Sequence, residues 1–365
     1  MIGAVIDESN FMSAFDDPAL AAAQLEANKV NAAGGVDGHP LKFIVENDQL
    51  DAAKTKSDAL DVISKGAQIL WVTCDVDEST PSIQVGLSKQ MLTVSPCIGT
   101  DQMGPSRFGP PGDLAFSFGN AARDEGSALA QLAIQKGWKT ANVITDNSLI
   151  YYKRDCQAFG IRFKQLGGQV LNNLSFTAGD GTIGNVASKA ESSKAAVNAI
   201  CTASSTKELP TFLTDIRTVN DQAPVIGPWS LDGSFWLPKS PKIANNIWVI
   251  TYASIYGDDP SPAVQKLEQQ LKAEGKAPTT GGFVTGAAAV DGLVTAIKRA
   301  GGSTNGAKLA AQLVKFHNVP TISGDINFSS TLHSVFGREY RVIHIVNGKP
   351  GFAELIKADH PVTLP

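Results

Sequence analysis

The chain has 365 residues, a formal net charge of −4, 43% apolar residues and 18% charged residues. A single hydrophobic core stops growing below this length, so we expect two domains in an ordinary folded protein. The acidic balance and the scattered lysines and arginines argue against a nucleic-acid or acidic-membrane surface, and no apolar stretch reaches the roughly 18 residues that suggest a membrane span.

Short β-rich runs alternate with amphipathic segments along the chain. After the first run we expect a helix with Asp17 as its N-cap and Pro18 as its first residue, ending before Gly34-Gly35. A second helix is expected from Asp51 to about Lys65. This alternation predicts parallel sheets covered on both faces, and therefore an α/β fold. The expected strands are Ile2–Ile6, Leu41–Glu46, Ile69–Thr73, Leu92–Ser95, Thr140–Thr145, Gln169–Phe176, Ala196–Cys201 and Pro224–Gly227, with a further buried strand within Ile247–Ile255.

Motifs typical of enzymes are missing from the sequence. No GxGxxG follows the first strand, and there is no P-loop, GxSxG elbow or HExxH helix. The carboxylates have no spacing that singles out a general acid and base. We therefore predict a protein that is not an enzyme and that binds no cofactor and no metal ion. The histidines are far apart and are interpreted as surface or core residues: His39, His317, His333, His344 and His360.

The four cysteines contain no CxxC pair, which argues against a zinc ribbon and a thioredoxin motif. Cys74 and Cys97 each follow an expected strand, and consecutive parallel strands are often neighbours about 4.8 Å apart, a separation that a disulfide tolerates. Cys156 and Cys201 are the candidates for a second bridge. Four buried free thiols are the alternative, whereas two disulfides would favour an oxidising compartment.

Five segments in chain order resemble a known family. Val30–Leu41 reads VNAAGGVDGHPL, and the other segments are Glu46–Asp48, Thr93–Thr100, Val225–Pro228 and Gly282–Val284. On these segments, and in order from Ile2 to about Val346, the chain resembles the leucine/isoleucine/valine-binding family of type I periplasmic binding proteins.

The resemblance implies two doubly wound parallel-sheet lobes with a ligand cleft between them. Three hinge crossings are expected near Phe118, Thr251 and Phe328. Lobe 1 would then hold residues 1–118 plus 253–328, and lobe 2 would hold residues 119–252 plus 329–365.

In open α/β sheets ligands lie beyond the carboxyl ends of the strands, where helix N-termini suit a carboxylate. For the loop after Thr73 the resemblance implies a carboxylate-binding serine, and Ser79 is the candidate. An ungapped count falls nearer Val76 or Asp77, and capping of the following helix is an equal alternative for Ser79. The resemblance also implies contacts from the loop after Ser95, where Cys97, Ile98, Gly99 and Thr100 are the candidates, with helix capping as the alternative for Thr100.

Aromatic residues are the second group of ligand candidates. The resemblance implies that Tyr151 or Tyr152 faces the cleft, and which of them does so stays open. Phe283 matches a ligand-facing aromatic of the family, with core packing as the alternative. Phe11 is equally interpreted as a wall of the cleft or as a core residue.

Trp229 departs from the family pattern, because amino-acid binders have an acidic residue after Gly-Pro that pairs with the ligand's ammonium group. A desolvated ammonium without a counter-charge costs several kcal/mol, so we expect no simple branched-chain amino acid held by the usual contacts. Trp229 instead suits a flat or apolar acid. An aromatic box around a cation, assisted by Asp75 or Asp77, is the alternative.

The sequence thus predicts an extracytoplasmic solute-binding component of an ABC importer. We expect a monomer that takes up a small organic acid or an amino-acid-like ligand by cleft closure and docks transiently on a membrane permease. The first residues contain no signal peptide, so a periplasmic or extracellular location requires that a signal has been removed, and a lipid anchor in the precursor is compatible with it. A ligand-sensing regulator or receptor domain of the same fold is the alternative, and a Rossmann-type enzyme is a third interpretation.

Overall fold

The computed structural model describes residues 1–364, and the chain divides into two compact units. Unit 1 comprises Met1–Ala121 and Ser261–Arg338, and unit 2 comprises Ala122–Pro260 and the residues from Glu339 on. The chain therefore passes from one unit to the other three times. The crossings expected near Phe118, Thr251 and Phe328 lie on the N-terminal side of these three boundaries.

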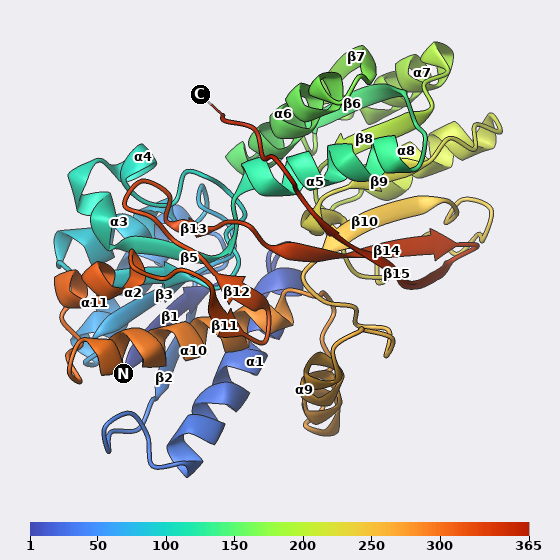
Figure 1. The fold of residues 1–365 in the computed structure, drawn as a ribbon. Helices are drawn as coiled ribbons and strands as arrows, with labels where there is room; N and C mark the ends of the chain where they lie inside the picture. The colour runs from blue at the N-terminus through green and yellow to red at the C-terminus, as the bar shows by residue number, and fades with distance from the viewer. Residues whose placement is uncertain (365) are drawn as a thin grey trace. The chain divides into compact units, whose positions relative to one another are not determined.

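Unit 1 is built on a six-stranded parallel sheet with the order β13-β5-β4-β3-β1-β2. Apolar residues of α1, α10 and α11 pack with Ile2, Ala4 and Ile6 of β1 on one face, and Val62 of α2 lies against Gly3 on the other. Helices α1 and α10 run side by side although they are far apart in the sequence (Figure 1). The elements of unit 1 are β1 (Ile2–Ile6), α1 (Ser13–Ala32), β2 (Phe43–Asn47), α2 (Ala52–Ser64), β3 (Ile69–Val72), α3 (Thr80–Ser88), β4 (Leu92–Ser95), α4 (Pro105–Phe108), the 3₁₀ helix η1 (Pro110–Leu114), β5 (Ala115–Asn120), α9 (Pro262–Ala273), α10 (Phe283–Arg299), α11 (Gly306–Leu313), β11 (Val319–Thr321), β12 (Gly324–Ile326) and β13 (Ser334–Val335).

Unit 2 is built on a seven-stranded sheet with the order β15-β14-β10-β9-β8-β6-β7. Its core joins all of these strands except β15 to α7 and α8, while α5 and α6 pack together. The C-terminal segment crosses α5, where the Val362 N–H donates to Ser127 Oγ (Figure 1). The elements are α5 (Ala122–Gln135), β6 (Thr140–Asp146), α6 (Ile150–Gln165), β7 (Gln169–Phe176), α7 (Ile183–Ser193), β8 (Val197–Cys201), α8 (Glu208–Thr218), β9 (Val225–Gly227), the 3₁₀ helix η2 (Trp229–Leu231), β10 (Ile247–Thr251), β14 (Glu339–Val346) and β15 (Lys349–Lys357).

The last two strands of unit 2 correct the prediction of purely parallel sheets. β14 runs antiparallel to β10, and β15 runs antiparallel to β14. Asn347 and Gly348 join β14 to β15, and both have positive φ angles (52° and 77°), as a tight hairpin turn requires. A two-residue connection permits only antiparallel pairing, so this Asn-Gly pair was the sequence signal for the exception.

The predicted start of the first helix was wrong, because α1 begins at Ser13 and contains Pro18. Proline has no N–H, so the Ala14 carbonyl loses its usual partner within the helix. The hydroxyls of Thr279 and Thr280 donate to this carbonyl instead, at 2.9 and 3.3 Å. Residues distant in sequence thus make the proline tolerable inside the helix.

The other predicted elements agree closely with the structure. β1, β4 and β7 have the predicted bounds, and α2 lies within one residue of its predicted bounds. Asp51 is its N-cap, and the Asp51 side chain accepts the Lys54 N–H at 2.8 Å. Among the described residues, no helix combines the length and the apolar character that crossing a membrane would require.

Candidate functional site

Three neighbouring strands of unit 1 (β4, β3 and β1) end at the same edge of the sheet, because they are adjacent and parallel. The loops that follow them are those in which the sequence places the ligand contacts of this unit.

The loop after β1 folds around the Asp7 carboxylate. This side chain is buried and accepts the backbone N–H groups of Asn10 at 2.8 Å, and of Ser9 and Met12 at 3.1 Å each. Such local bonds fix a turn without regular secondary structure. Phe11, a candidate wall residue, is half-buried in this turn.

The loop after β3 folds around Asp75 in the same way. Asp75 Oδ1 accepts the N–H groups of Asp77 at 2.7 Å and Glu78 at 3.1 Å. Burial, and to a lesser degree the nearby charge of Asp77, raises the pKa of Asp75 to about 7. The charge of Asp77 itself is compensated by Arg107 from α4, whose Nη2 lies 2.7 Å from Asp77 Oδ1. A bound anion would therefore meet less negative charge here than the sequence suggests.

Ser79 occupies the N-cap position of α3 and is fully buried. Its side chain makes no capping hydrogen bond, so the capping role expected as the alternative is wrong. The hydroxyl instead donates to the carbonyl of Asp75, which closes the loop. The ligand-binding role of Ser79 stays a prediction.

The loop after β4 carries Cys97, Ile98, Gly99 and Thr100, all of which are buried. Ser95 Oγ accepts the N–H groups of Cys97 and Ile98 at 3.3 and 3.2 Å. Hydroxyl groups of other elements then bind the loop carbonyls: Ser117 Oγ donates to the Ile98 oxygen at 2.7 Å, and Ser334 Oγ donates to the Thr100 oxygen at 2.5 Å.

Two further details define this loop. Thr100 Oγ1 accepts the Gln102 N–H at 3.3 Å within the loop, and α4 begins only at Pro105, so the helix-capping alternative for Thr100 is wrong. Gly119 of β5 lies directly against the loop, and a Cβ atom at this position would overlap the backbone carbonyls of Cys97 and Ile98. The close approach of the loop to β5 therefore depends on glycine.

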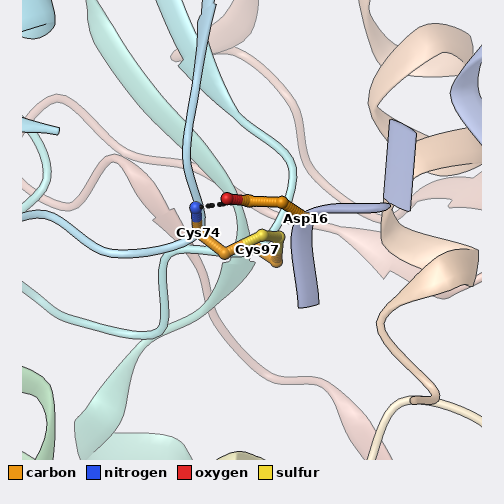
Figure 2. Close-up of side chains that lie close together, drawn as sticks. All are labelled: Asp16, Cys74 and Cys97. Atoms are coloured by element: carbon orange, nitrogen blue, oxygen red, sulfur yellow. Dashed lines mark hydrogen bonds between the residues drawn. A yellow bond between two sulfur atoms is a disulfide. The ribbon is translucent and has the colours of Figure 1, made fainter. Parts of the chain in front are cut away.

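A disulfide joins the loops after β3 and β4, because Cys74 is bonded to Cys97 across a Cα–Cα distance of 4.8 Å. Asp16 of α1 lies beside this bridge and accepts the Cys74 N–H at 2.8 Å (Figure 2). The carboxylate and the two sulfurs lie within 4.8 Å of one another, which is close enough for a metal site. Each sulfur is bonded to the other, however, so neither is a thiolate that could ligate a metal ion.

In unit 2 the candidate residues gather around the buried carboxylate of Glu125 in α5. Glu125 Oε1 accepts the backbone N–H of Trp229 at 2.7 Å, and Oε2 accepts the hydroxyl of Tyr151 at 2.8 Å. Burial, and secondarily the charge of Glu125, raises the pKa of Tyr151 well above its usual value, so this hydroxyl stays protonated and donates. A carboxylate therefore lies beside Trp229 although position 229 itself is not acidic.

Five aromatic rings form a continuous cluster in unit 2, which we call the aromatic cluster. The ring centroids of Trp229 and Tyr252 lie 5.1 Å apart, those of Tyr151 and Tyr152 lie 5.6 Å apart, and those of Tyr151 and Trp229 lie 6.5 Å apart. Tyr340 of β14 adjoins Tyr252 at 6.4 Å. These residues come from α6, η2, β14 and the position directly after β10, and all five are buried.

The remaining candidates lie elsewhere. Phe283 is the first residue of α10 in unit 1 and is fully buried, so its predicted ligand contact stays a prediction beside its alternative of core packing. In unit 2, Cys156 of α6 is bonded to Cys201 at the end of β8, across a Cα–Cα distance of 5.9 Å. This bridge fixes the helix that carries Tyr151 and Tyr152 to the sheet.

Sequence reasoning missed Asp16, Glu125, Tyr252 and Tyr340. Asp16 and Glu125 sit in helices whose pattern indicates ordinary amphipathic segments, and both are nevertheless buried. For Glu125 the sequence offers two acidic residues in the first turn of a helix, and this pattern does not separate a buried glutamate from an exposed one. Tyr252 directly follows β10, and tyrosines at strand ends are candidates in any sheet of this class.

These findings define the class of the protein. The family described as periplasmic binding protein matches residues 1–350, and the chain belongs to this family. Comparison with curated proteins gives no sequence match.

Solved structures with the same fold are similar over nearly the whole chain. The branched-chain amino acid transporter substrate-binding protein LivJ from Streptococcus pneumoniae, in complex with isoleucine, has 18% identity and a TM-score of 0.83, covering 98% of this chain and 99% of its own. The leucine-binding protein LivK from Thermotoga maritima has 19% identity, a TM-score of 0.84 and the same coverage. A solute-binding protein of an ABC transporter from R. palustris, in complex with benzoate, has 18% identity and a TM-score of 0.79, covering 99% of this chain and 98% of its own.

Proposed function

We propose that this chain is the extracytoplasmic solute-binding component of an ABC importer, and that its ligand is a small organic acid or amino-acid-like compound with an aromatic or apolar body. The family assignment over residues 1–350 supports the transport role. The aromatic cluster around Trp229 supports the ligand class and is the observation on which this choice rests.

The aromatic cluster favours a flat ligand for physical reasons. Tyrosine and tryptophan offer large apolar faces together with polar edges, and they bind planar groups by offset or edge-to-face contact. Pockets for small molecules combine such faces with a few polar groups that fix the orientation of the ligand. Glu125, Tyr151 and the Trp229 backbone are the polar groups of unit 2 that meet this description.

The loops of unit 1 suit the polar end of the ligand. They present buried backbone and hydroxyl groups after three adjacent strands, and Arg107 compensates the charge of Asp77. Residues Ser79 and Cys97 to Thr100 remain our candidates for these contacts. Closure of the two lobes on the ligand is part of the proposal, and small-angle scattering with and without a saturating ligand tests it.

Three further statements belong to the proposal. The chain acts by binding and not by catalysis, as its family indicates. It works outside the cytoplasm, where both disulfides would persist. It delivers its ligand as a monomer to a membrane permease, to which it binds transiently.

A thermal-shift screen tests the proposal. The panel consists of L-leucine, L-isoleucine, L-valine, L-phenylalanine, L-tyrosine, benzoate and 4-hydroxybenzoate. A ligand that binds only the native state raises the melting temperature, and at 100 times its Kd it adds about 2.7 kcal/mol of stability. We expect shifts with aromatic members and little or none with leucine, isoleucine and valine. A clear shift with leucine alone would contradict the ligand class, and no shift with any member would contradict the proposed function.

A further inference from the structure

One buried carboxylate in unit 1 connects two of the three loops described above. Asp16, in the first turn of α1, is only 2% exposed. Its Oδ1 accepts the Cys74 N–H at 2.8 Å, and its Oδ2 accepts the Asp7 N–H at 3.1 Å and the Thr73 hydroxyl. The ends of β1 and β3 are thereby fastened to each other through α1.

The third loop is joined to the same point by two links. The Cys74–Cys97 disulfide connects the residue after Thr73 to the loop after β4 (Figure 2). Ser95 Oγ also donates to the Thr73 carbonyl at 3.1 Å, while it accepts the two N–H groups that start the β4 loop. Thr73 is therefore bound on one side by Asp16 and on the other by Ser95.

We infer that Asp16 is a positioning residue for ligand binding, which together with the Cys74–Cys97 disulfide holds the loops of residues 7–12, 74–79 and 96–100 in their binding geometry. This inference rests on the proposed function, because those loops carry the candidate contacts of unit 1. Asp16 itself need not touch the ligand.

The physical reason is preorganisation. Loops that are already ordered in the free protein lose little conformational entropy on binding, and this raises affinity without any new contact. Asp16→Asn keeps one acceptor oxygen and replaces the other with an NH2 group, which is a donor. At least one of the buried donors of Asp7, Thr73 and Cys74 would then lose its acceptor, so the loops would rearrange to find other partners. Binding would then have to restore the original geometry.

Asp48 provides a matched control in the same unit. It is also a fully buried aspartate that follows a strand, and it accepts one backbone N–H (Leu50, 3.0 Å) and one threonine hydroxyl (Thr55, 3.1 Å). Both of these partners lie between β2 and the first residues of α2, outside the three loops. The charge of Asp48 lies near Asp7 and Asp16, but Asp48→Asn removes none of the hydrogen bonds that hold the three loops. This replacement should therefore reduce stability without loosening the candidate binding loops.

The test compares Asp16→Asn, Asp48→Asn and Thr73→Val in the full chain. Thr73→Val removes a single hydroxyl with little change of shape and serves if Asp16→Asn folds poorly. Amide hydrogen exchange without ligand is the first measurement. We expect faster exchange in residues 7–12 and 74–79 for Asp16→Asn and Thr73→Val, and faster exchange near residues 48–55 alone for Asp48→Asn. Unchanged amide exchange in residues 74–79 in both Asp16→Asn and Thr73→Val would overturn the inference, whether or not a ligand is known.

Calorimetry with the panel compound that shifts the wild type most is the second measurement. We expect Asp16→Asn to raise Kd about tenfold, whereas Asp48→Asn should leave Kd within about twofold of the wild-type value. The two variants should lose a similar amount of melting temperature. Combining Asp16→Asn with Cys74→Ser/Cys97→Ser should raise Kd by less than the product of the separate factors, because both changes loosen the same loops. Wild-type affinity in Asp16→Asn would overturn this inference alone, whereas the proposed function would fail only if the wild type bound no panel compound.

Discussion

The candidate residues of the two units are organised in opposite ways. In unit 1 the loops after β1, β3 and β4 are close in sequence to the strands that place them, and they are held by serine, threonine and aspartate side chains and by one disulfide. In unit 2 the aromatic cluster is collected from α6, η2, β10 and β14 around Glu125 of α5. Local rules of strand ends and turns thus place the first group, which Asp16, Ser117 and Ser334 then hold by bonds between distant segments, whereas the second group is assembled by tertiary packing.

This difference has energetic consequences. In unit 1 several side chains and one disulfide hold the loops, so the loss of one hydrogen bond should loosen a loop without a large loss in the free energy of unfolding. In unit 2 a single carboxylate accepts from both the Trp229 backbone and the Tyr151 hydroxyl. We therefore expect single substitutions to lower the free energy of unfolding more in unit 2 than in unit 1.

The largest effect is expected for Glu125→Ala. This change leaves two buried donors without their acceptor, at about 2 kcal/mol each, so the free energy of unfolding should fall by about 4 kcal/mol. Urea titration followed by tryptophan fluorescence measures this loss. Glu125→Gln retains an acceptor oxygen and should lose about half as much. An alanine variant within about 1 kcal/mol of the wild type would show that the aromatic cluster does not depend on this carboxylate.

The two disulfides offer the next comparison. Removing the Cys156–Cys201 bridge, which spans 45 residues, should lower the free energy of unfolding by about 3 kcal/mol. Removing Cys74–Cys97, which spans 23 residues, should cost about 0.6 kcal/mol less, because the closed segment is half as long. Chemical unfolding of the double-serine variants measures both losses. A larger loss for the shorter bridge would indicate that bonding around Asp16 outweighs chain entropy.

Gly119→Ala in unit 1 should lower the free energy of unfolding by a smaller amount. The loss arises because the added methyl group would overlap the loop after β4. Overpacking of this kind costs about 2 kcal/mol and should also weaken ligand binding. Gly160→Ala in α6 is the control, since a Cβ there has only Val143 nearby, at 4.0 Å, and alanine favours helices. The control should gain up to about 1 kcal/mol in thermal or chemical unfolding. Equal stability of both variants would contradict the assigned loop packing.

The smallest change in stability at pH 5 is expected for Asp75→Asn. The amide oxygen of the asparagine can retain both backbone hydrogen bonds of Asp75 Oδ1. Burial raises the pKa of Asp75 from 3.8 to about 7 in the folded protein, so the wild type loses stability as the pH rises through this interval. Asparagine does not titrate, and the variant should therefore gain stability relative to the wild type between pH 5 and pH 8. Melting temperatures across this range measure the difference, and a constant difference would refute the raised pKa.

The same contrast explains what the sequence could predict. The α/β class, strands β1 to β4 of unit 1, strands β6 to β10 of unit 2 and the three loops follow from apolar runs and from the rule that ligands lie beyond strand ends. Glu125 could not be predicted in this way, because its partner Trp229 is more than 100 residues away and no local pattern distinguishes a buried glutamate from an exposed one.

The start of α1 was mispredicted for the same reason. Asp17-Pro18 is a sound local signal for a helix start, but Thr279 and Thr280 supply the donors that allow the helix to begin earlier. In each of these cases the missing information lies in contacts between segments that are distant in the chain.

The most direct test of the central claim is isothermal titration calorimetry of the wild type with benzoate, 4-hydroxybenzoate, L-phenylalanine and L-leucine. We predict one ligand bound per chain, with a Kd at or below about 10 μM for at least one aromatic compound and much weaker binding of leucine. Saturable binding of leucine in the same range with no heat from the aromatic compounds would contradict the assigned ligand class. The absence of binding for every compound would contradict the account of the chain as a binding protein for such solutes.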